Sequence, residues 1–108
     1  MRATHTVQHE VWSAGPADGH GNVSDMWAEP TDRPVYGWSQ RSSSEPKQVG
    51  ANRLVVDLEM FSPWGAATKD RVTILGRRFE VVGESEDWNH GPFGWHPGFV
   101  VNLVRIDG

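Results

Sequence analysis

The sequence lacks cysteine, long apolar runs and clustered basic residues. Without cysteine the chain can form neither disulfide bonds nor zinc sites with thiolate ligands. No segment comes near the roughly 18 consecutive apolar residues that a membrane-spanning helix needs. The first residues also lack the apolar stretch of a secretory signal peptide. We therefore expect a protein that does not span a membrane and is not exported by that route.

Positive charge is scarce as well. Ten Lys and Arg residues stand against 14 Asp and Glu, which gives a formal net charge of −4. A protein that grips nucleic acid neutralises phosphates with clustered Lys and Arg, whereas the basic residues here are scattered. The chain also has no Gly-x-Ser-x-Gly nucleophile motif and no phosphate-binding loop. These absences predict that the protein is not an enzyme and that nucleic-acid binding is not its main task.

The sequence does contain the turn residues and the alternating patterns that are typical of an all-β domain. The 108 residues fit one domain, and seven Pro and 12 Gly indicate many turns. Residues 4–12 and 53–61 alternate apolar and polar side chains, as half-buried strands do, and residues 35–40 form a shorter candidate strand. The only helical candidate is a single turn near residues 24–29. We therefore predict one domain over residues 1–108 with little or no helix.

Residues 71–83 have the pattern of a tight β-hairpin. Gly76 and Arg77 are predicted to form its two-residue loop, because a type II′ turn prefers Gly at its first position. That loop would pair Leu75 with Arg78, Ile74 with Phe79, Thr73 with Glu80 and Val72 with Val81. The pairing places four apolar side chains on one face of the hairpin, which we expect to be core: Val72, Ile74, Phe79 and Val81.

The last strand of the chain is apolar on both faces. Phe99, Val101 and Leu103 point one way, and the opposite face carries Val100, Val104 and Ile106. A two-sided strand indicates a central strand, a barrel whose outside is covered, or a subunit interface. Together the strands predict a small antiparallel β-barrel, either SH3-like or a partly open sandwich. Long loops are expected at about residues 13–34, 41–52 and 84–98.

Side chains able to bind metal or transfer protons are present but poorly placed. His5 and His9 lie about 13 Å apart on one strand face, too far to chelate one ion. His90 and His96 lie near Glu84 and Asp87, yet histidines in such loops more often serve as hydrogen-bonding turn residues. The acidic residues Glu84, Glu86 and Asp87 are near neighbours in an exposed turn, so a solvated negative patch is favoured over acid–base catalysis. No metal and no cofactor are expected.

Tryptophan is abundant, and every copy falls at a strand end or in a loop. The six positions are Trp12, Trp27, Trp38, Trp64, Trp88 and Trp95. Such residues either anchor binding partners or cap the open ends of a small barrel, and both interpretations remain open for Trp12, Trp38 and Trp64. For Trp88, Phe93 and Trp95 we expect an ordered loop that packs on its own barrel or on a neighbouring copy.

Three segments together resemble a known family. Residues 52–65, the hairpin start Asp70-Arg-Val-Thr-Ile and the loop Asp87-Trp-Asn-His-Gly-Pro-Phe-Gly-Trp-His-Pro-Gly98 are similar to head-to-tail stopper proteins of tailed phages, especially phages of actinobacteria. The resemblance covers about half of the chain. It implies a small β-barrel that assembles as a ring, commonly a dodecamer, in the neck of the virion after synthesis in the host cytoplasm. Such a ring retains packaged DNA and provides the docking platform for the tail.

The resemblance also implies partners and functional segments. The ring would lie below the portal and adaptor proteins and above the tail terminator, close to DNA but without reading its sequence. A candidate channel or gating loop comprises Arg41, Ser42, Ser43, Ser44, Glu45, Pro46, Lys47 and Gln48, with residues 13–34 as the other contender. A candidate interface loop comprises Trp88, His90, Phe93, Trp95 and His96. The candidate subunit-facing residues are Val100, Val104 and Ile106. The alternative function is a Trp-rich β-barrel module that binds carbohydrate or peptide.

Overall fold

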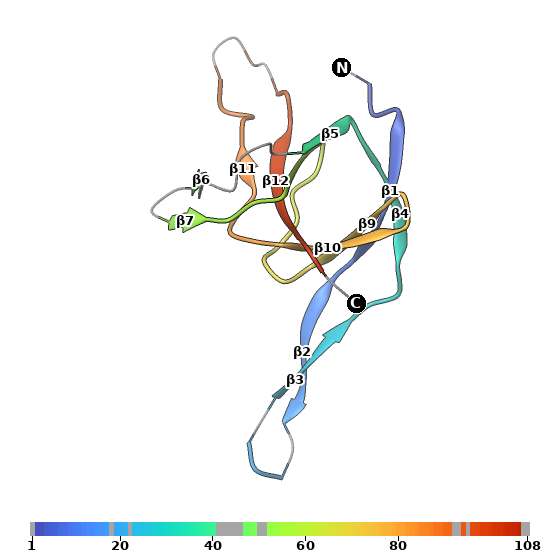
Figure 1. The fold of residues 1–108 in the computed structure, drawn as a ribbon, viewed down its shortest axis with the longest axis vertical. Helices are drawn as coiled ribbons and strands as arrows, with labels where there is room; N and C mark the ends of the chain where they lie inside the picture. Colours follow the sequence, from blue (N-terminus) through green and yellow to red (C-terminus); the bar gives the residue numbers. More distant parts are fainter. Residues whose placement is uncertain are drawn as a thin grey trace.

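The computed structural model describes residues 2–17, 19–21, 23–40, 47–49, 52–91, 94 and 96–106. These residues form strands and turns, which confirms the all-β prediction (Figure 1). The strands are β1 (His5–Glu10), β2 (Trp12–Ala17), β3 (Val23–Trp27), β4 (Thr31–Val35), β5 (Gly37–Gln40), β6 (Lys47–Val49), β7 (Asn52–Leu54), β8 (Leu58–Ser62), β9 (Arg71–Ile74), β10 (Arg77–Val81), β11 (Glu86–Asp87) and β12 (Phe99–Arg105). No helix that could cross a membrane occurs within those ranges.

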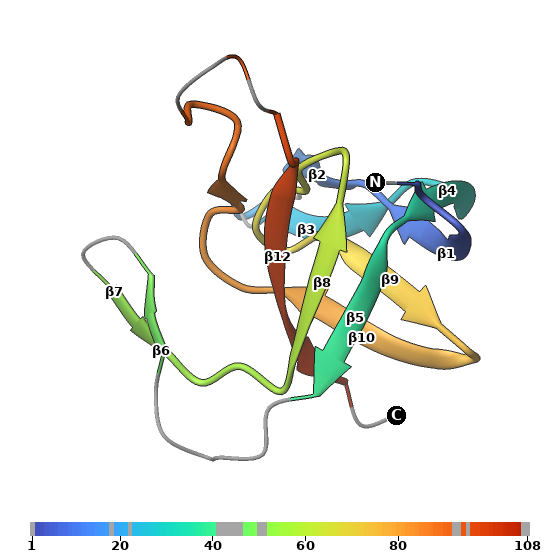
Figure 2. The ribbon, with the colours of Figure 1, turned by 90° about the horizontal axis from the view of Figure 1, so that it is seen from above.

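One rolled antiparallel sheet holds most of the strands. Its order is β4-β1-β9-β10-β12-β8-β5, and β11 pairs with β12 beside this path. Seen from above, β12, β8 and β5 lie side by side while β9 and β10 run behind them (Figure 2). The two ends of the order, β4 and β5, are consecutive in the chain and joined at Tyr36, whose N–H donates to the Phe61 carbonyl at 2.8 Å. The sheet thus rolls back toward itself as a partly open sandwich, one of the two predicted architectures.

The core fills the inside of this roll. The side chains of Met60, Val101 and Leu103 are fully buried, and Val35 of β4 joins them from the opposite end of the sheet order. The predicted hairpin face is confirmed as core, because Val72, Ile74, Phe79 and Val81 are all buried. Trp64 belongs to the same cluster and Trp38 packs against it. These two tryptophans therefore close the core, as the capping interpretation proposed.

The register of the β9–β10 hairpin differs from the predicted one. Arg77 pairs with Ile74 and Phe79 pairs with Val72, so the two-residue loop is Leu75-Gly76 and the pairing of Thr73 with Glu80 was wrong. Leu75 has φ 50° and Gly76 has φ 80°. Two positive φ values define a type I′ turn, whose twist suits a tight hairpin. The shift moves each partner by two residues, a full side-chain period, and the same four side chains stay buried.

All three segments expected to be long loops contain strands, and residues 84–98 hold the short strand β11. Residues 13–34 hold β2 and β3, which pair as a separate two-stranded sheet, and β4. The possible helical turn at residues 24–29 was wrong, because β3 occupies most of that range. Residues 41–52 hold β6 and the first residue of β7, and these two strands pair with each other. The predicted strand over residues 53–61 is interrupted, and Asp57 in the break donates its N–H to the Leu103 carbonyl at 2.9 Å.

The last strand is central, one of the three possibilities its pattern left open. β12 has β10 and β8 on its two sides and β11 at its start. Its Val101 and Leu103 side chains fill the core, whereas Val100 and Val104 on the other face stay half-buried. Ile106, just beyond the strand, is half-buried too. The outward face of β12 is therefore partly covered by its own chain and partly open.

A buried polar cluster joins β1 to the loop before β9. His9 and Asp70 are only 4% and 2% exposed, and the His9 Nε2 lies 2.8 Å from the Asp70 Oδ2. Arg33 directs a guanidinium nitrogen at the other ring nitrogen of His9, 3.3 Å away. Since arginine can only donate, this geometry assigns Nδ1 as acceptor and Nε2–H as donor to Asp70. Trp64 stacks on the imidazole at a centroid distance of 4.9 Å.

Candidate functional site

An open groove of about 860 Å³ is the candidate binding site on the rolled sheet. Its lining comes from β5, β8, β11 and β12, from Tyr36, and from both ends of the loop that joins β11 to β12. The lining residues are Tyr36, Gly37, Trp38, Glu59, Phe61, Glu86, Trp88, Pro97, Gly98, Phe99 and Val100. Five are aromatic and two are carboxylates. The volume lies in the range of natural ligand sites.

Strand register explains the floor of the groove. Glu86 pairs with Val100, Val100 with Phe61, and Phe61 with Gly37, so one cross-strand row runs from β11 to β5. Side chains of such a row share one face of the sheet. Neighbouring Met60 is fully buried and points to the core, so this row faces outward. The row begins with a carboxylate, continues over Val100 and Phe61, and ends at a glycine.

Gly37 leaves the β5 end of the groove open. A Cβ built at this glycine meets no atom within 4 Å, and its φ lies outside the positive region that disfavours other residues. A larger side chain at this position would therefore enter the groove without strain in the backbone. Across the groove, Trp88 forms part of the wall and is 59% exposed.

The loop that carries Trp88 is fastened at its two ends. The Trp88 N–H donates to the Gly98 carbonyl at 3.1 Å, and the Gly98 N–H donates to the Asn89 side chain at 2.8 Å. Gly98 has φ 116°, and a Cβ there would clash with the Ser62 carbonyl. The glycine that ends the family-like loop is thus required by backbone geometry. It fixes where Trp88 stands.

Asp87 organises the start of the same loop. Its Oδ1 accepts the Asn89 N–H at 2.9 Å and its Oδ2 lies 3.0 Å from the His90 Nε2. The hydrogen bond from the Asn89 backbone, assisted by the charge of His90, lowers the pKa of Asp87 below its ordinary value. His90 thus acts as a turn residue, the role favoured from the sequence. Among the described residues, no three His, Asp or Glu side chains gather in a metal-binding arrangement.

Glu86 and Glu59 are the two carboxylates of the groove. The Glu86 Oε2 accepts a hydrogen bond of 2.9 Å from the Asn102 amide, whose residue is fully buried in β12. This contact holds Glu86 at the end of the cross-strand row. Glu59 lies two residues before Phe61 on β8, so the two side chains share the outward face of the strand. Both carboxylates line the groove beside its aromatic side chains.

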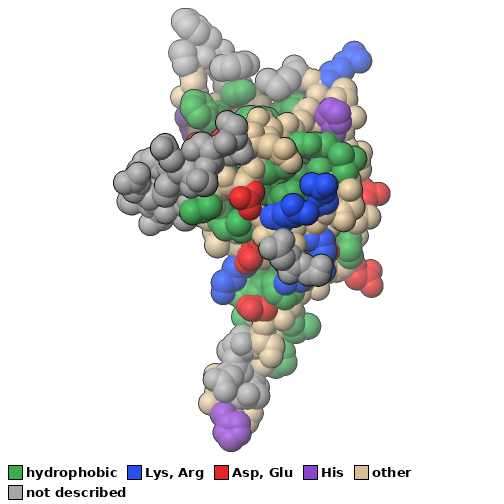
Figure 3. Space-filling model, viewed as in Figure 1, with side chains coloured by type: hydrophobic (Ala, Val, Ile, Leu, Met, Phe, Trp, Pro, Cys, Tyr) green, Lys and Arg blue, Asp and Glu red, His purple; other side chains and the backbone are tan. Residues whose placement is uncertain are grey.

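The second candidate surface is the two-stranded hairpin of β2 and β3, which we call the arm. It projects from the roll as a narrow extension, and hydrophobic side chains lie along it (Figures 1 and 3). The molecule measures 53 × 30 × 28 Å along its principal axes, an elongation that follows the arm. Val11 before the arm and Met26 within it are each 50% exposed.

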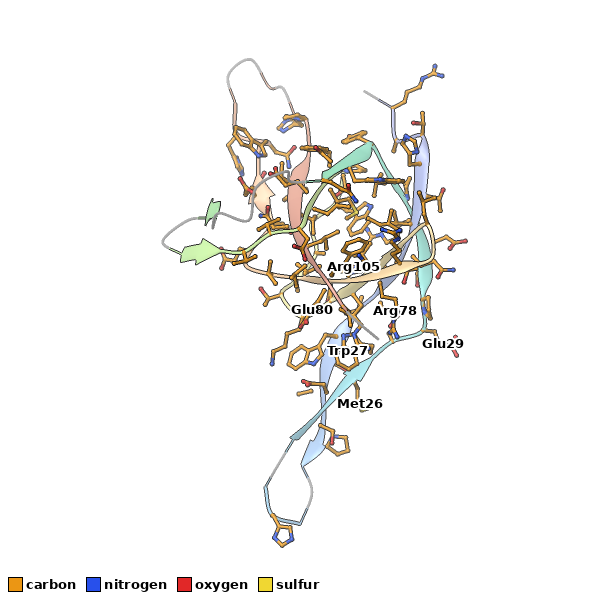
Figure 4. The ribbon with its side chains drawn as sticks, in the orientation of Figure 1. Met26, Trp27, Glu29, Arg78, Glu80 and Arg105 are labelled. Carbon is orange, nitrogen blue, oxygen red and sulfur yellow. The ribbon has the colours of Figure 1, made fainter. Side chains whose placement is uncertain are left out.

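The base of the arm is held by tryptophan. Trp12 and Trp27 face each other across β2 and β3, and Figure 4 shows Trp27 where the arm meets the roll, with Met26 one residue further out. The Arg71 guanidinium lies 3.5 Å from the Trp27 ring centre, and the Lys69 ammonium lies 4.5 Å from that of Trp12. The Trp27 indole N–H also donates to the Lys69 carbonyl at 2.8 Å. These contacts fix the arm's direction at its root.

The residues predicted as functional from sequence fall into separate places. Of the candidate gating loop, residues 41–46 lie outside the described residues, and Lys47 and Gln48 belong to β6. Phe93 and Trp95 of the interface loop also lie outside, while Trp88, His90 and His96 are exposed. Trp88 is 59% exposed, so it packs only in part on its own chain, and packing on a neighbouring copy stays a prediction. Val100 lines the groove, unlike Val104 and Ile106.

Sequence reasoning missed most of the groove. The strand predicted over residues 53–61 ends at Phe61, and this residue stands on the outward face, 37% exposed, within the cross-strand row. Its place opposite Met60 in the alternation was the available signal. Tyr36 and Trp38 line the groove because the chain bends between β4 and β5. No local sequence pattern predicts this bend.

Comparison with known proteins adds no further identification. No protein-family model matches the chain, and no curated protein matches it.

Proposed function

We propose that this protein is a head-to-tail stopper of a tailed phage. It forms a homo-oligomeric ring in the virion neck, below the portal and adaptor proteins and above the tail terminator. The ring retains packaged DNA and provides the platform on which the tail docks. In this role the protein is a structural component, and its function resides in protruding segments and interfaces.

The arm is the observation that carries the proposal furthest. It extends from the roll, leaves Met26 half exposed, and is fixed at its root by Trp12 and Trp27. A directed, partly apolar projection is suited to contact with another subunit, because exposed apolar area that a single chain does not bury favours association. When one surface contacts a different surface on the next copy, repetition closes a ring if the rotation closes. The sequence resemblance supports the same assignment independently.

Gating of the DNA channel is assigned to residues 41–52 or to the arm. At the end of the first segment, β6 (Lys47–Val49) pairs with β7 (Asn52–Leu54) as a short antiparallel hairpin. Copies of such a segment around a ring converge on one axis and can obstruct a channel without reading sequence. The low content of basic residues agrees with a channel that holds DNA loosely.

A phage that lacks this gene tests the proposal. We expect its heads to fill with DNA, then lose it, and to remain tailless, because neither the plug nor the platform is present. Supplying the protein from a plasmid should restore DNA-filled, tailed particles, counted by electron microscopy and by titre. Normal infectious particles without the gene would contradict the proposal.

The second candidate function is a binding module for carbohydrate or peptide. The groove favours it, because exposed Trp88 and Phe61 offer aromatic surface to a ligand while Glu59 and Glu86 offer acceptors. The two functions are compatible, since a ring component also needs sites for its partners.

A further inference from the structure

We infer that the groove of one copy receives the outer part of the arm of the next copy, with the ring of Pro16 seated among the aromatic side chains of the groove. The inference rests on the proposed ring, and it names the contact that joins the subunits. Each subunit gives its arm to one neighbour and its groove to the other.

The chain exposes more surface than a compact monomer of its size. Its accessible surface is 7184 Å², whereas folded monomers of 12.1 kDa expose roughly 6,000 Å². Its radius of gyration is 15.0 Å, against roughly 13 Å for a compact domain of this length. The excess surface of roughly 1,200 Å² is larger than the roughly 800 Å² that one partner contributes to a standard interface. The extended shape therefore supplies the area that a contact between copies requires.

The arm and the groove lie toward opposite ends of the molecule. In Figure 1 the arm projects from one end of the long axis, and the strands β5, β11 and β12 that line the groove lie toward the other. The cation contacts of Trp12 and Trp27 fix the arm at its root, so it points away from the groove of its own copy. Two different surfaces of one chain that fit each other make a head-to-tail contact, which closes a ring when the rotation closes.

The outer part of the arm is narrow and uncharged along β2. Residues 13–17 read Ser-Ala-Gly-Pro-Ala. A Cβ at Gly15 would lie 3.0 Å from the Met26 sulfur, so the glycine leaves room for Met26 beside β2. Asp25 lies on the partner strand β3, where it accepts the Trp12 indole N–H at 2.8 Å. Residues 13–17 thus bring no like charge to the two carboxylates of the groove.

Pro16 is the side chain of the arm that fits the groove. It is exposed, and it lies where the register of β2 and β3 shifts between Ala14 and Ala17. Proline donates no backbone hydrogen bond, and on an edge strand it discourages pairing with a further strand. Grooves lined by aromatic side chains accept proline rings instead. Contact through the ring of Pro16 is therefore favoured over the addition of a strand.

The groove has an aromatic lining with open space inside it. Trp88 follows β11 at one end of the cross-strand row, and Trp38 belongs to β5 at the other. Between these two strands Phe61 is 37% exposed, and at Gly37 no side chain occupies the groove. The space over Phe61 and Gly37 is therefore accessible to a small apolar ring.

Cross-linking of the full chain tests this contact, because the chain has no cysteine of its own. Ala14→Cys places a thiol on the exposed part of β2 two residues before Pro16, and Gly37→Cys places one in the groove. The two proteins, one of them isotope-labelled, are mixed at about 0.5 mM each and treated with a short bis-maleimide. Mass spectrometry then separates hetero-linked from homo-linked dimers.

We expect at least about tenfold more hetero-linked dimer from this pair than when Leu75→Cys replaces Gly37→Cys. Leu75 is 85% exposed and lies outside the groove, so its thiol reports random collisions.

Further substitutions locate the contact. Pro16→Ser in the Ala14→Cys protein should lower the yield at least about fivefold, whereas Pro30→Ser, at an exposed proline outside the arm, should leave it unchanged. Trp88→Ala in the Gly37→Cys protein should lower the yield similarly. Its matched control is Val55→Ala, at an exposed apolar residue outside the groove, which should have no effect. Circular dichroism and thermal melts establish that each variant is folded.

Three results would overturn the inference: a hetero-linked yield no higher than that of the Leu75→Cys pair, a yield unchanged by folded Pro16→Ser, or a yield unchanged by folded Trp88→Ala. The first result is also expected if the groove takes a carbohydrate or a peptide of another protein in place of the arm. If the parent protein still adds a ring to portal–adaptor complexes, the proposed function stands and only this contact is wrong. Linked dimers of a protein that adds no ring would instead support the contact and contradict the proposed function.

Discussion

Asp70→Ala is expected to lower the free energy of unfolding by about 3–5 kcal/mol, as is found when one member of a buried polar pair is removed. The Asp70 carboxylate accepts hydrogen bonds from the His9 ring at 2.8 Å, from the Trp12 N–H at 2.9 Å and from the Ala67 N–H at 3.2 Å. Alanine would leave these donors without the acceptor that now serves them, and unsatisfied buried donors are costly. Domains of this kind are stable by about 5–15 kcal/mol in total, so the loss is a large fraction.

Urea denaturation followed by tryptophan fluorescence measures this effect. Asp70→Asn retains one acceptor oxygen and should cost less than Asp70→Ala. Asp32→Ala, an exposed carboxylate on β4, is the matched surface control and should change stability by less than about 0.5 kcal/mol. If Asp70→Ala unfolded at the same urea concentration as the parent, the cluster would not be holding β1 and the arm's root to the roll.

Shortening the arm is expected to abolish assembly while leaving the fold intact. Ala14 and Asp25 are a cross-strand pair of β2 and β3. Replacing residues 15–24 by Asn-Gly links this pair through a two-residue loop. The dipeptide suits a two-residue hairpin turn. The Trp12 indole keeps its hydrogen bond of 2.8 Å to Asp25, so the root of the arm stays in place. We expect a change of less than about 1 kcal/mol in the free energy of unfolding, because the removed residues whose burial the structure describes lie outside the core.

Complementation of the gene-deleted phage measures the effect on assembly. The shortened protein should give no tailed, DNA-filled particles, because the arm now ends beside Met26 and no longer projects far enough to reach the neighbouring subunit. The control is Leu75→Asn in the turn of the β9–β10 hairpin. Residue 75 is 85% exposed and has a positive φ, which Asn adopts readily. This variant should complement fully. Full complementation by the shortened arm would show that β2 and β3 have no part in assembly.

Much of the fold could be predicted from alternation alone, since residues 5–10 of the predicted first strand form β1 and the apolar face of the β9–β10 hairpin is buried as expected. The register of that hairpin could not be, because a shift by two residues keeps the same side chains inside. The register is set by the turn, in which both Leu75 and Gly76 have a positive φ. The alternation of apolar and polar residues predicts which side chains share a face of the sheet, but it does not predict which residues pair across two strands.

The arm escaped prediction for a different reason. Its strands are rich in Gly, Pro, Ala and Ser, residues that rarely mark strands, and the hairpin buries little surface. What stabilises it lies at its root, where Trp12 and Trp27 meet cations from residues 69 and 71. Those partners are distant in sequence. The groove is likewise assembled from separate strands, so only Trp38, Trp88 and Val100 of its lining were singled out from the sequence.

The ring assignment is tested most directly by electron microscopy of the purified protein mixed with portal–adaptor complexes of its phage. The account predicts an additional ring of density below the adaptor, with the rotational symmetry of the complex and one copy of this chain in each repeat. The shortened-arm variant should add no ring. Complexes that stay unchanged when the parent protein is present in excess, or density at a position other than the end that receives the tail, would contradict the account.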